Sequence, residues 1–574
     1  MRHCFFRIIR HNPERNRMHR WHRILLASAM TTTLASPAIA AADPSDKTRH
    51  AQVDALFARW DGKATPGCAL GITRNGVLEY ARGYGMSNLE HGIPITPQSI
   101  FHIASISKQF TAFSIGLLAQ DGKLSLEDDI RKYVPELPDL GMPITISQLI
   151  HHTNGLREQG QLVNLAGWRS DDLTTEPDIL WALTRQRHLN FAPGTEVVYG
   201  NAAYTVLAVI VRRVSGVSLR AYADAHIFQP LGMSSTHFHD DHKEMVAGRT
   251  AAYSPRAGGS WSISIPHIDH YGSTSLFSTV GDLLKWQQNL VDGRIGGPAL
   301  SAWMQTSGTL NDGSPIAYGS GLRLGAYRGL RMVSHDGADA GYRSEAVMFP
   351  DQKLAIVALC NASPAVPTEL TRKVAELYLN EQMTEPALAP ALPAPPAVPA
   401  AWAGVYWSAQ TDEILRLEWK DGVLRQAGVA AALVPIADKV FRPADMPHEW
   451  RFTSTTDSGP VTLHIRDFWP TQRSFVQINE AMPSSAALAA FTGRYHSDET
   501  DMRYTVRVVD GVLRLSWPRQ YDIELTPAGG NRFTSSFGTI TFIPGASGKI
   551  GSLSISNRRL RRFESLRVAQ EGEG

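Results

Sequence analysis

A proline-rich stretch at residues 386–400 (PALAPALPAPPAVPA) divides the chain and constrains its fold more than any other feature. It holds six prolines among alanine, leucine and valine. This composition favours an extended, semi-rigid linker. The chain has 574 residues, which is too long for one ordinary domain. We therefore predict one large domain at 43–385 and two small β-domains at 401–482 and 483–574.

The tail beyond the linker contains a degenerate repeat. Residues 404–408 (GVYWS) are echoed by 493–497 (GRYHS), and residues 420–424 (KDGVL) by 509–513 (VDGVL). Both elements are 89 residues apart, which is the spacing of two copies of one small β-domain. Two copies indicate a tandem duplication and not a solenoid.

The part before the linker has strands at both ends and helices between them. The segment CALGIT at 68–73 begins a hairpin through Asn75-Gly76, which is a strong turn signal. Three further antiparallel strands are predicted at 330–334, 344–349 and 354–359. This order predicts a mixed α/β domain whose terminal strands share one sheet.

Two helices stand out between these strands. Apolar residues at helical spacing predict one helix at 105–120. A second is predicted at 276–293, with Thr279 and Asp282 placed as a capping box.

The N-terminal extension has the features of a targeting segment. Arg20 and Arg23 precede the apolar run 24–34, and Ala38-Ile39-Ala40 forms a small-x-small cleavage site. We predict a signal peptide with a basic extension at 1–40, with Met18 as an alternative start. The run is too short to span a bilayer, so we expect export to a periplasm or secretion, without stable membrane insertion.

The overall charge gives no reason to expect a nucleic-acid partner. The formal net charge is +2, but residues 1–42 contain seven arginines and one glutamate, so the remainder is near −4. Beyond this extension the cysteines are Cys68 and Cys360, both in strand-like runs. A disulfide and two buried thiols are both compatible with this pattern. The absence of a CxxC motif gives no sign of a thiolate zinc site.

A serine three residues ahead of a lysine stands where an irregular approach becomes an apolar helix. If that helix starts near Ser105, Lys108 lies on the same side, about one turn away. A serine hydroxyl is a poor nucleophile until a neighbouring group takes its proton, and a lysine helps when burial lowers its pKa. The first-turn backbone N–H groups suit a developing oxyanion. Alone, the S-x-x-K pattern is a weak signal because both residues are common.

A tyrosine and an asparagine stand just ahead of another predicted helix. Tyr199 beside a lysine ammonium could ionise to tyrosinate more easily than its ordinary pKa allows, which makes it a candidate general base. The amide of Asn201 could hold both the lysine and a substrate carbonyl.

A third motif follows the predicted strand 330–334. His335 could offer its imidazole to a substrate, and Gly337 is small enough to admit backbone close to a ligand. In isolation, a histidine in a loop is the favoured explanation of this motif.

Taken together, the order and spacing of these three motifs resemble those of the serine β-lactamase and penicillin-binding-protein-like hydrolases. The resemblance is to the branch with class C β-lactamases, D-aminopeptidases and related esterases, and it covers roughly residues 50–382. Other segments that resemble the family include PGCALGITRNGVLEYARGYG, LIHHTNGL, FAPGTEVVYGNAAYTVLAVIV, LGMSSTHF and LFSTVGDLLKW.

This resemblance implies a fold and roles for the motif residues. The fold would be α/β, with a mixed antiparallel sheet flanked by helices, an all-helical lobe and the site in the cleft between them. Ser105 would be the acylated nucleophile, while Lys108 and Tyr199 would share general acid/base work. Asn201 would position the substrate, and His335 would stand at the third motif. No metal or organic cofactor is implied.

One departure from the family pattern bears on the substrate. True β-lactamases and D,D-carboxypeptidases carry a lysine in the third motif, where this chain has His335. A mostly uncharged histidine removes a permanent positive charge that helps bind a carboxylate. The interpretation is a D-aminopeptidase-like peptidase or amidase acting on a small peptide, D-amino-acid amide or ester. An esterase and a β-lactamase or D,D-carboxypeptidase remain alternatives.

The resemblance also bears on the tail. D-aminopeptidases of this family carry two small antiparallel β-barrels after the catalytic domain, which matches the two predicted β-domains. A tail loop that reaches and restricts the cleft is a hypothesis, under which deleting 401–574 should change the substrate range.

Two alternatives come from other classes. The segment His237–His242 (HFHDDH) fits H-x-H-x-D-H, the signature of metallo-β-lactamase-type zinc hydrolases, although it does not stand in the βαβ-type loop that their fold requires. A penicillin-recognising sensor, acylated once and not released, would share the serine motifs. The oligomeric state is left open.

Overall fold

The computed structural model describes residues 44–568, apart from 387, 389, 393–399, 445, 447, 455–459, 468–470, 480 and 521. The predicted signal peptide at 1–40 lies outside the described residues, as does much of the predicted linker at 386–400.

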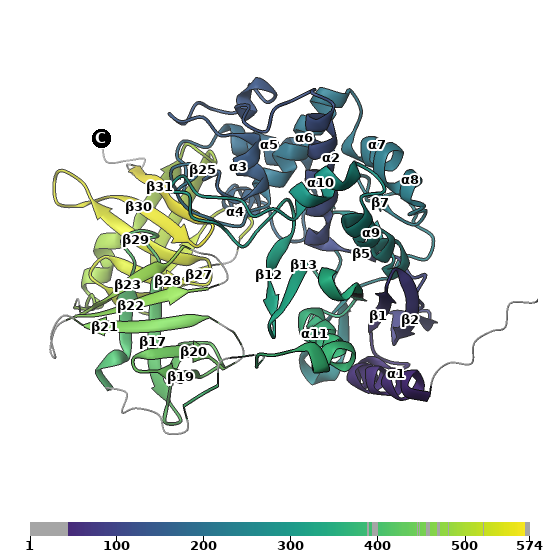
Figure 1. Ribbon diagram of the computed structural model, residues 1–574. Helices are drawn as coiled ribbons and strands as arrows, with labels where there is room; N and C mark the ends of the chain where they lie inside the picture. Colours follow the sequence, from purple (N-terminus) through teal and green to yellow (C-terminus); the bar gives the residue numbers. More distant parts are fainter. Residues whose placement is uncertain are drawn as a thin grey trace, which may run out of the picture. The chain divides into compact units, whose positions relative to one another are not determined.

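The central sheet of the large domain has six strands in the order β12-β13-β14-β15-β1-β2. Figure 1 labels β12 and β13 toward one side of this domain and β1 and β2 toward the other. All neighbours pair antiparallel, and the first and last strands of the domain share the sheet as predicted. The strands are β1 (Cys68–Arg74), β2 (Val77–Tyr84), β12 (Arg323–Tyr327), β13 (Leu330–Asp339), β14 (Tyr342–Phe349) and β15 (Leu354–Cys360).

Strand β13 runs past the predicted end at residue 334. His335 pairs with Ala346 and Gly337 with Ser344 in the ladder with β14, so the third motif lies within a strand and not in a loop after it. Pairing with β14 continues the strand as far as Asp339.

The two faces of the sheet are covered by different helices. On β1, Cys68, Leu70 and Ile72 pack in one cluster with α1 (Pro44–Phe57) and α11 (Pro367–Leu379). The alternate residue Gly71 faces α9 (Val280–Asp292), and a Cβ at that position would lie 2.9 Å from Leu284 Cδ1. The period of two along the strand therefore assigns each side chain to one of two apolar layers.

An all-helical lobe lies between the two halves of the sheet in the sequence. Its central helix is α6, whose first ten residues are buried and which ends at Gly216, a left-handed cap with φ of 80°. The helices of the lobe are α2 (Ser107–Gln120), α3 (Ile146–Ile150), α4 (Gln159–Leu165), α5 (Glu176–Thr184), α6 (Ala202–Ser215), α7 (Leu219–Ala223) and α8 (Gln229–Leu231).

Both predicted helices exist, with shifted starts. Residues 104–106 form a 3₁₀ turn before α2 begins at Ser107. Residues 276–278 are strand β11, and α9 begins only at Val280. The Thr279 hydroxyl caps α9 by accepting from the Asp282 N–H, but the Asp282 carboxylate accepts from the Ser235 N–H, so the reciprocal half of the capping box goes elsewhere.

Short elements complete the large domain. They are α10 (Gly297–Met304), β3 (Met86–Asn88), β4 (Ile93–Pro94), β5 (Phe101–His102), β6 (Thr174–Thr175), β7 (His237–Phe238), β8 (Tyr253–Pro255), β9 (Trp261–Ile263), β10 (Ile268–Asp269) and β11 (Leu276–Ser278).

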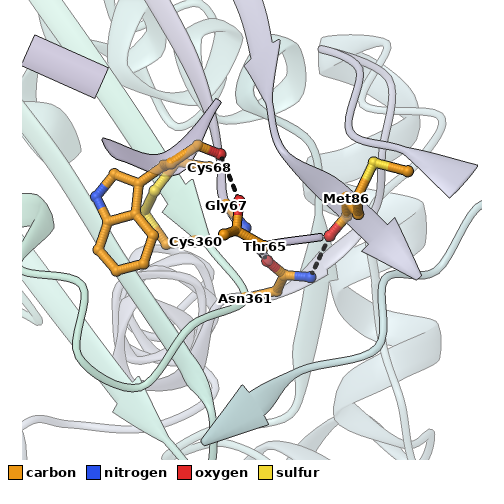
Figure 2. Close-up of a disulfide and its surroundings, with 7 residues drawn as sticks. Thr65, Gly67, Cys68, Met86, Cys360 and Asn361 are labelled. Carbon is orange, nitrogen blue, oxygen red and sulfur yellow. Dashed lines mark hydrogen bonds between the residues drawn. A yellow bond between two sulfur atoms is a disulfide. The ribbon is translucent and has the colours of Figure 1, made fainter. Parts of the chain in front are cut away.

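Cys68 and Cys360 form a disulfide between paired strands, which resolves the alternative left open by the sequence (Figure 2). The two residues lie opposite each other on β1 and β15, with Cα atoms 4.0 Å apart. Asn361, next to the bond, accepts from the Gly67 N–H at 2.7 Å and donates to the Met86 carbonyl at 3.0 Å. The disulfide joins β1 to β15, and the Asn361 hydrogen bonds hold the chain next to it.

The tail contains two antiparallel eight-stranded β-structures, as predicted. The first has the order β18-β17-β16-β23-β22-β21-β20-β19, and a single bridge between Arg425 and Ala432 brings its ends together. The second, β24 to β31, is a closed barrel. Strands of the first are β16 (Gly404–Trp407), β17 (Ile414–Lys420), β18 (Val423–Gln426), β19 (Leu433–Ala437), β20 (Val440–Pro443), β21 (Glu449–Ser454), β22 (Val461–Arg466) and β23 (Arg473–Ile478). Strands of the second are β24 (Gly493–Ser497), β25 (Met502–Val509), β26 (Val512–Ser516), β27 (Ile523–Gly529), β28 (Arg532–Ser535), β29 (Gly538–Pro544), β30 (Ile550–Asn557) and β31 (Leu560–Val568).

The sequence repeat is a structural repeat. Asp421-Gly422 and Asp510-Gly511 both form two-residue turns with positive φ, 55° and 77° in the first copy and 52° and 78° in the second. Both dipeptides link neighbouring antiparallel strands, which is the turn that Asp-Gly favours.

Within the described residues, no single helix is long and apolar enough to cross a membrane. Two consecutive helical segments, Ala202–Ser215 and Leu219–Leu231, reach that length and hydrophobicity only when they are taken together, and a bend of 75° separates them.

Candidate active site

Ser105 lies in the tight turn between β5 and α2. The residue before it, Ala104, has a φ of 50°, a left-handed conformation that costs energy for any residue with a Cβ. The turn is held by Ser107, whose hydroxyl donates to the Ala104 carbonyl at 2.6 Å and accepts from the Leu276 N–H at 3.1 Å. Ser105 is thereby directed into a cavity of about 340 Å³.

Lys108 is buried beneath Ser105. Its amine donates to Ser105 Oγ at 3.1 Å, to Asn201 Oδ1 at 2.8 Å and to the Ser273 carbonyl at 2.7 Å. Burial lowers the pKa of Lys108 to about 7, against the opposing charge of Glu158. A large fraction of this lysine is therefore neutral near neutral pH, as a base for the serine hydroxyl requires.

Tyr199 and Asn201 precede α6 and join the same group. The Lys108 amine lies 4.9 Å from the centre of the Tyr199 ring. Burial raises the pKa of Tyr199, although a hydrogen bond with Ser105 acts in the opposite direction. The tyrosinate expected from the sequence is therefore opposed by burial, and the neutral hydroxyl is the form present at neutral pH.

His335 lies close to this group but does not line the cavity. Its Nδ1 donates to the Asp336 carbonyl at 2.6 Å, and its Nε2 accepts from the Tyr318 hydroxyl at 2.9 Å. Burial, together with the charge of Arg323, lowers the pKa of His335 to about 3. The imidazole is neutral, as expected, but the cavity is lined by its neighbour Asp336 and not by His335 itself.

Gly337 has a packing role that the sequence did not indicate. A Cβ there would lie 2.4 Å from the Ile103 carbonyl oxygen and 2.3 Å from Ser344 Oγ. The glycine therefore admits the turn that carries Ser105, where we had expected it to admit a ligand.

Two residues outside the three motifs support residues 199–201, which we call the tyrosine loop. Glu158 accepts from the Asn201 N–H at 2.7 Å, and His152 Nδ1 accepts from the Gly200 N–H at 3.3 Å. His152 belongs to the segment LIHHTNGL that resembled the family, but Glu158 lies outside it. Its contact joins residues 43 positions apart, which no local pattern reveals.

The cavity is lined from both the large domain and the tail. The large domain contributes Ser105, Val198, Tyr199, Asn201, Arg323, Asp336 and Ala338. The tail contributes His448, Asp467, Arg558 and Arg559. A tail loop thus reaches the site, as hypothesised, and its effect on substrate range remains a prediction.

The turn between β30 and β31 is fixed to the large domain. The Arg559 carbonyl accepts from the Glu158 N–H at 3.1 Å and from Asn190 Nδ2 at 2.9 Å. Two residues further on, Arg561 is buried and donates to both oxygens of Glu196, at 3.1 and 2.9 Å. Glu158 therefore holds the tyrosine loop with its side chain and the tail turn with its backbone.

The His237–His242 segment, considered above as an alternative zinc motif, lies elsewhere. His237, His239 and Glu244 have ligand atoms within 4.8 Å of one another, as do Asp241, His242 and Asp269. Arg220 already donates to both oxygens of Glu244, at 2.6 and 2.7 Å, and its positive charge disfavours a cation there. None of these residues lines the cavity that contains Ser105.

The sequence matches the Beta-lactamase family over residues 53–381, more than half of the chain, and the chain belongs to this family. A D-aminopeptidase of Gluconobacter oxydans (strain 621H) is 28% identical over 314 residues, which cover 54% of this chain and 58% of that protein. The match thus spans less than two thirds of that relative. A D-aminopeptidase of Brucella canis is 24% identical over 371 residues, 65% of this chain and 68% of that protein.

Solved structures agree with the fold. The octameric penicillin-binding protein homologue from Pyrococcus abyssi has a TM-score of 0.53 and 22% identity, covering 75% of this chain and 99% of its own. SurE has a TM-score of 0.54 and 22% identity, covering 76% of this chain and 99% of its own. The predicted fold class and family resemblance are both confirmed.

Proposed function

We propose that this protein is a serine hydrolase that forms an acyl-enzyme on Ser105, with D-aminopeptidase-like activity on small amides or short peptides. The observation that carries the proposal is the contact of the buried Lys108 amine with both Ser105 Oγ and Asn201 Oδ1. The pKa of about 7 for Lys108 supplies a base at the pH where the enzyme would work.

Acylation begins when neutral Lys108 accepts the proton of the Ser105 hydroxyl. The serine oxygen then bonds to the substrate carbonyl carbon, and the carbonyl oxygen takes up the negative charge. Backbone N–H groups of the turn that carries Ser105 are expected to stabilise this oxyanion. Cleavage of the carbon–nitrogen bond gives the acyl-enzyme.

Tyr199 is suited to protonate the leaving amine. Its hydroxyl is neutral and hydrogen-bonded to Ser105. It can therefore give a proton to the departing nitrogen and recover one from the Lys108 ammonium. Water then attacks the carbonyl carbon of the ester while Lys108 accepts a proton from it. Cleavage of the bond between that carbon and Ser105 Oγ releases the acid, and the Lys108 ammonium returns the proton to the serine oxygen. Asn201 holds the lysine in place throughout.

The relatives named D-aminopeptidase favour a D-amino-acid amide or peptide over other acyl substrates. One of the similar solved structures is that of SurE with D-Leu, a D-amino acid. Esters and β-lactams would react by the same steps and are competing substrates for the test below.

We also propose that the protein is exported. The basic and apolar features of residues 1–40 and the Cys68–Cys360 disulfide both favour an oxidising compartment such as a periplasm. Cell fractionation of the full chain, with a reporter fused after residue 574, tests this location.

The test of the function is mass spectrometry of the intact protein after exposure to an acylating probe, with Ser105→Ala alongside. We expect one adduct on Ser105, absent from the variant, and turnover of D-amino-acid amides. An adduct that is never released indicates the sensor. No adduct, with hydrolysis lost to a chelator, contradicts the serine mechanism and supports the His237–His242 segment.

A further inference from the structure

Among the residues that the structure describes, five charged side chains line the cavity, and four of them form ion pairs. Arg323 Nε lies 2.8 Å from Asp336 Oδ1, and Arg558 pairs with Asp467. The fifth, Arg559, has no hydrogen bond or ion pair to its guanidinium among the described residues. The described part of the lining therefore carries one positive charge without an ion-pair partner, which is that of Arg559.

Arg559 is held against the catalytic tyrosine. Its guanidinium carbon lies 5.3 Å from the centre of the Tyr199 ring, and its own carbonyl is fixed by Glu158 and Asn190. Its charge reaches the reacting groups, since it helps to lower the pKa of Lys108. A guanidinium placed in this way presents a planar set of donors to an anion in the cavity.

The positive charge of Arg559 changes the expectation that the third motif gave for carboxylate binding. The replacement of lysine by neutral His335 suggested a site without positive charge for a carboxylate. The turn between β30 and β31, far away in the sequence, brings Arg559 to the same cavity. The loss at one motif is therefore offset by a residue that only the tail supplies.

We propose that Arg559 binds a carboxylate on the leaving portion of the substrate. Tyr199 is placed to protonate the leaving nitrogen, and Arg559 lies over its ring, so the anion belongs on that side of the scissile bond. The preferred substrates are then short peptides with a free C-terminal carboxylate, ahead of the corresponding amides. This inference rests on the serine hydrolase function proposed above.

The test compares D-alanylglycine with D-alanylglycinamide, which differ by the carboxylate alone. Calorimetric titration uses the full chain carrying Ser105→Ala, so that binding is measured without turnover. We expect the free acid to bind about tenfold more tightly than the amide, as a hydrogen-bonded ion pair allows. In the same background Arg559→Gln should bring the ratio near one, and Arg559→Lys should retain part of it.

Arg494→Gln is the matched control, because Arg494 is an exposed arginine of the same barrel and does not line the cavity. It should leave the ratio unchanged. Equal affinities for the two ligands, no detectable binding of the free acid, or a ratio that Arg559→Gln leaves intact would each overturn the proposal. The proposed function fails separately, if wild-type protein neither hydrolyses a ligand nor forms a Ser105 adduct.

Discussion

The guanidinium of Arg157 is fully buried and donates to Glu499 at 2.9 Å, across 342 residues of sequence. The same guanidinium donates to the carbonyls of Arg561 and Arg562, next to the turn that enters the cavity. Arg157 follows directly after LIHHTNGL, and Glu499 lies in the second barrel. This ion pair therefore links the part of the large domain next to the site with the barrel that completes the cavity.

We predict that Arg157→Met destabilises the protein by about 3–5 kcal/mol, because Glu499 is left as an unpaired buried charge. Arg157→Met combined with Glu499→Leu should recover much of this loss. Differential scanning calorimetry of the two variants measures the difference. Arg187→Met is the control, since Arg187 pairs with neighbouring Asp498 at 3.1 Å but is 59% exposed, and it should cost about 1 kcal/mol or less. A single variant no worse than this control would contradict the prediction.

The pH dependence of activity should report Lys108. The proposed mechanism needs the neutral amine, so kcat/KM should fall about tenfold per pH unit below a pKa near 7 and level off above it. Tyr199→Phe should lower the rate while leaving this limb in place, because the limb belongs to the lysine. Stopped assays from pH 5 to pH 9 measure the profile. A limb near 4 instead would point to a carboxylate base.

Glu158 should act as a positioning residue. The negative charge of Glu158 raises the pKa of Lys108 against burial, so Glu158→Gln should shift the acidic limb to lower pH. The glutamine oxygen can still accept from the Asn201 N–H, so much of kcat should remain, whereas Glu158→Ala should lose it. Glu127→Gln, at an exposed glutamate, provides the control profile. An unshifted limb in Glu158→Gln would show that the charge has no effect on the lysine.

The disulfide should contribute to stability without entering the chemistry. Cys68 and Cys360 close a loop with a sequence separation of 292, so reduction or Cys68→Ala with Cys360→Ala should cost about 3–5 kcal/mol. Thermal unfolding with and without reductant measures the loss, after thiol titration has established the oxidised state. Activity at a temperature well below the transition should persist, since neither cysteine lines the cavity. A reduced protein as stable as the oxidised one would contradict the prediction.

The deletion of residues 401–574 is a less direct test than the sequence suggested. It would remove the loop that lines the cavity. It would also expose buried Arg157 and remove the hydrogen bond that the Tyr504 hydroxyl donates to the Leu165 carbonyl. Substitutions at Arg559 change the site with less effect on the fold.

The sequence by itself determined the parts whose signals are local. The hairpin at Asn75-Gly76, the repeat around Asp421 and Asp510, and the pair Ser105 and Lys108 were all read from neighbouring residues. Their physical causes, turn preference and helical spacing, act over a few positions. The family resemblance added the order in which Tyr199, Asn201 and His335 follow.

Tertiary structure decided what depends on distant residues and on burial. The strand partner β14 extended β13 through His335, and packing against Ile103 gave Gly337 its role. Desolvation lowers the pKa of Lys108 and raises that of Tyr199, so the lysine is the better base, and desolvation depends on the surrounding fold. Arg559 reaches the site from a turn more than 350 residues beyond Tyr199, because the second barrel packs there. Spatial proximity of this kind leaves no local pattern in the sequence.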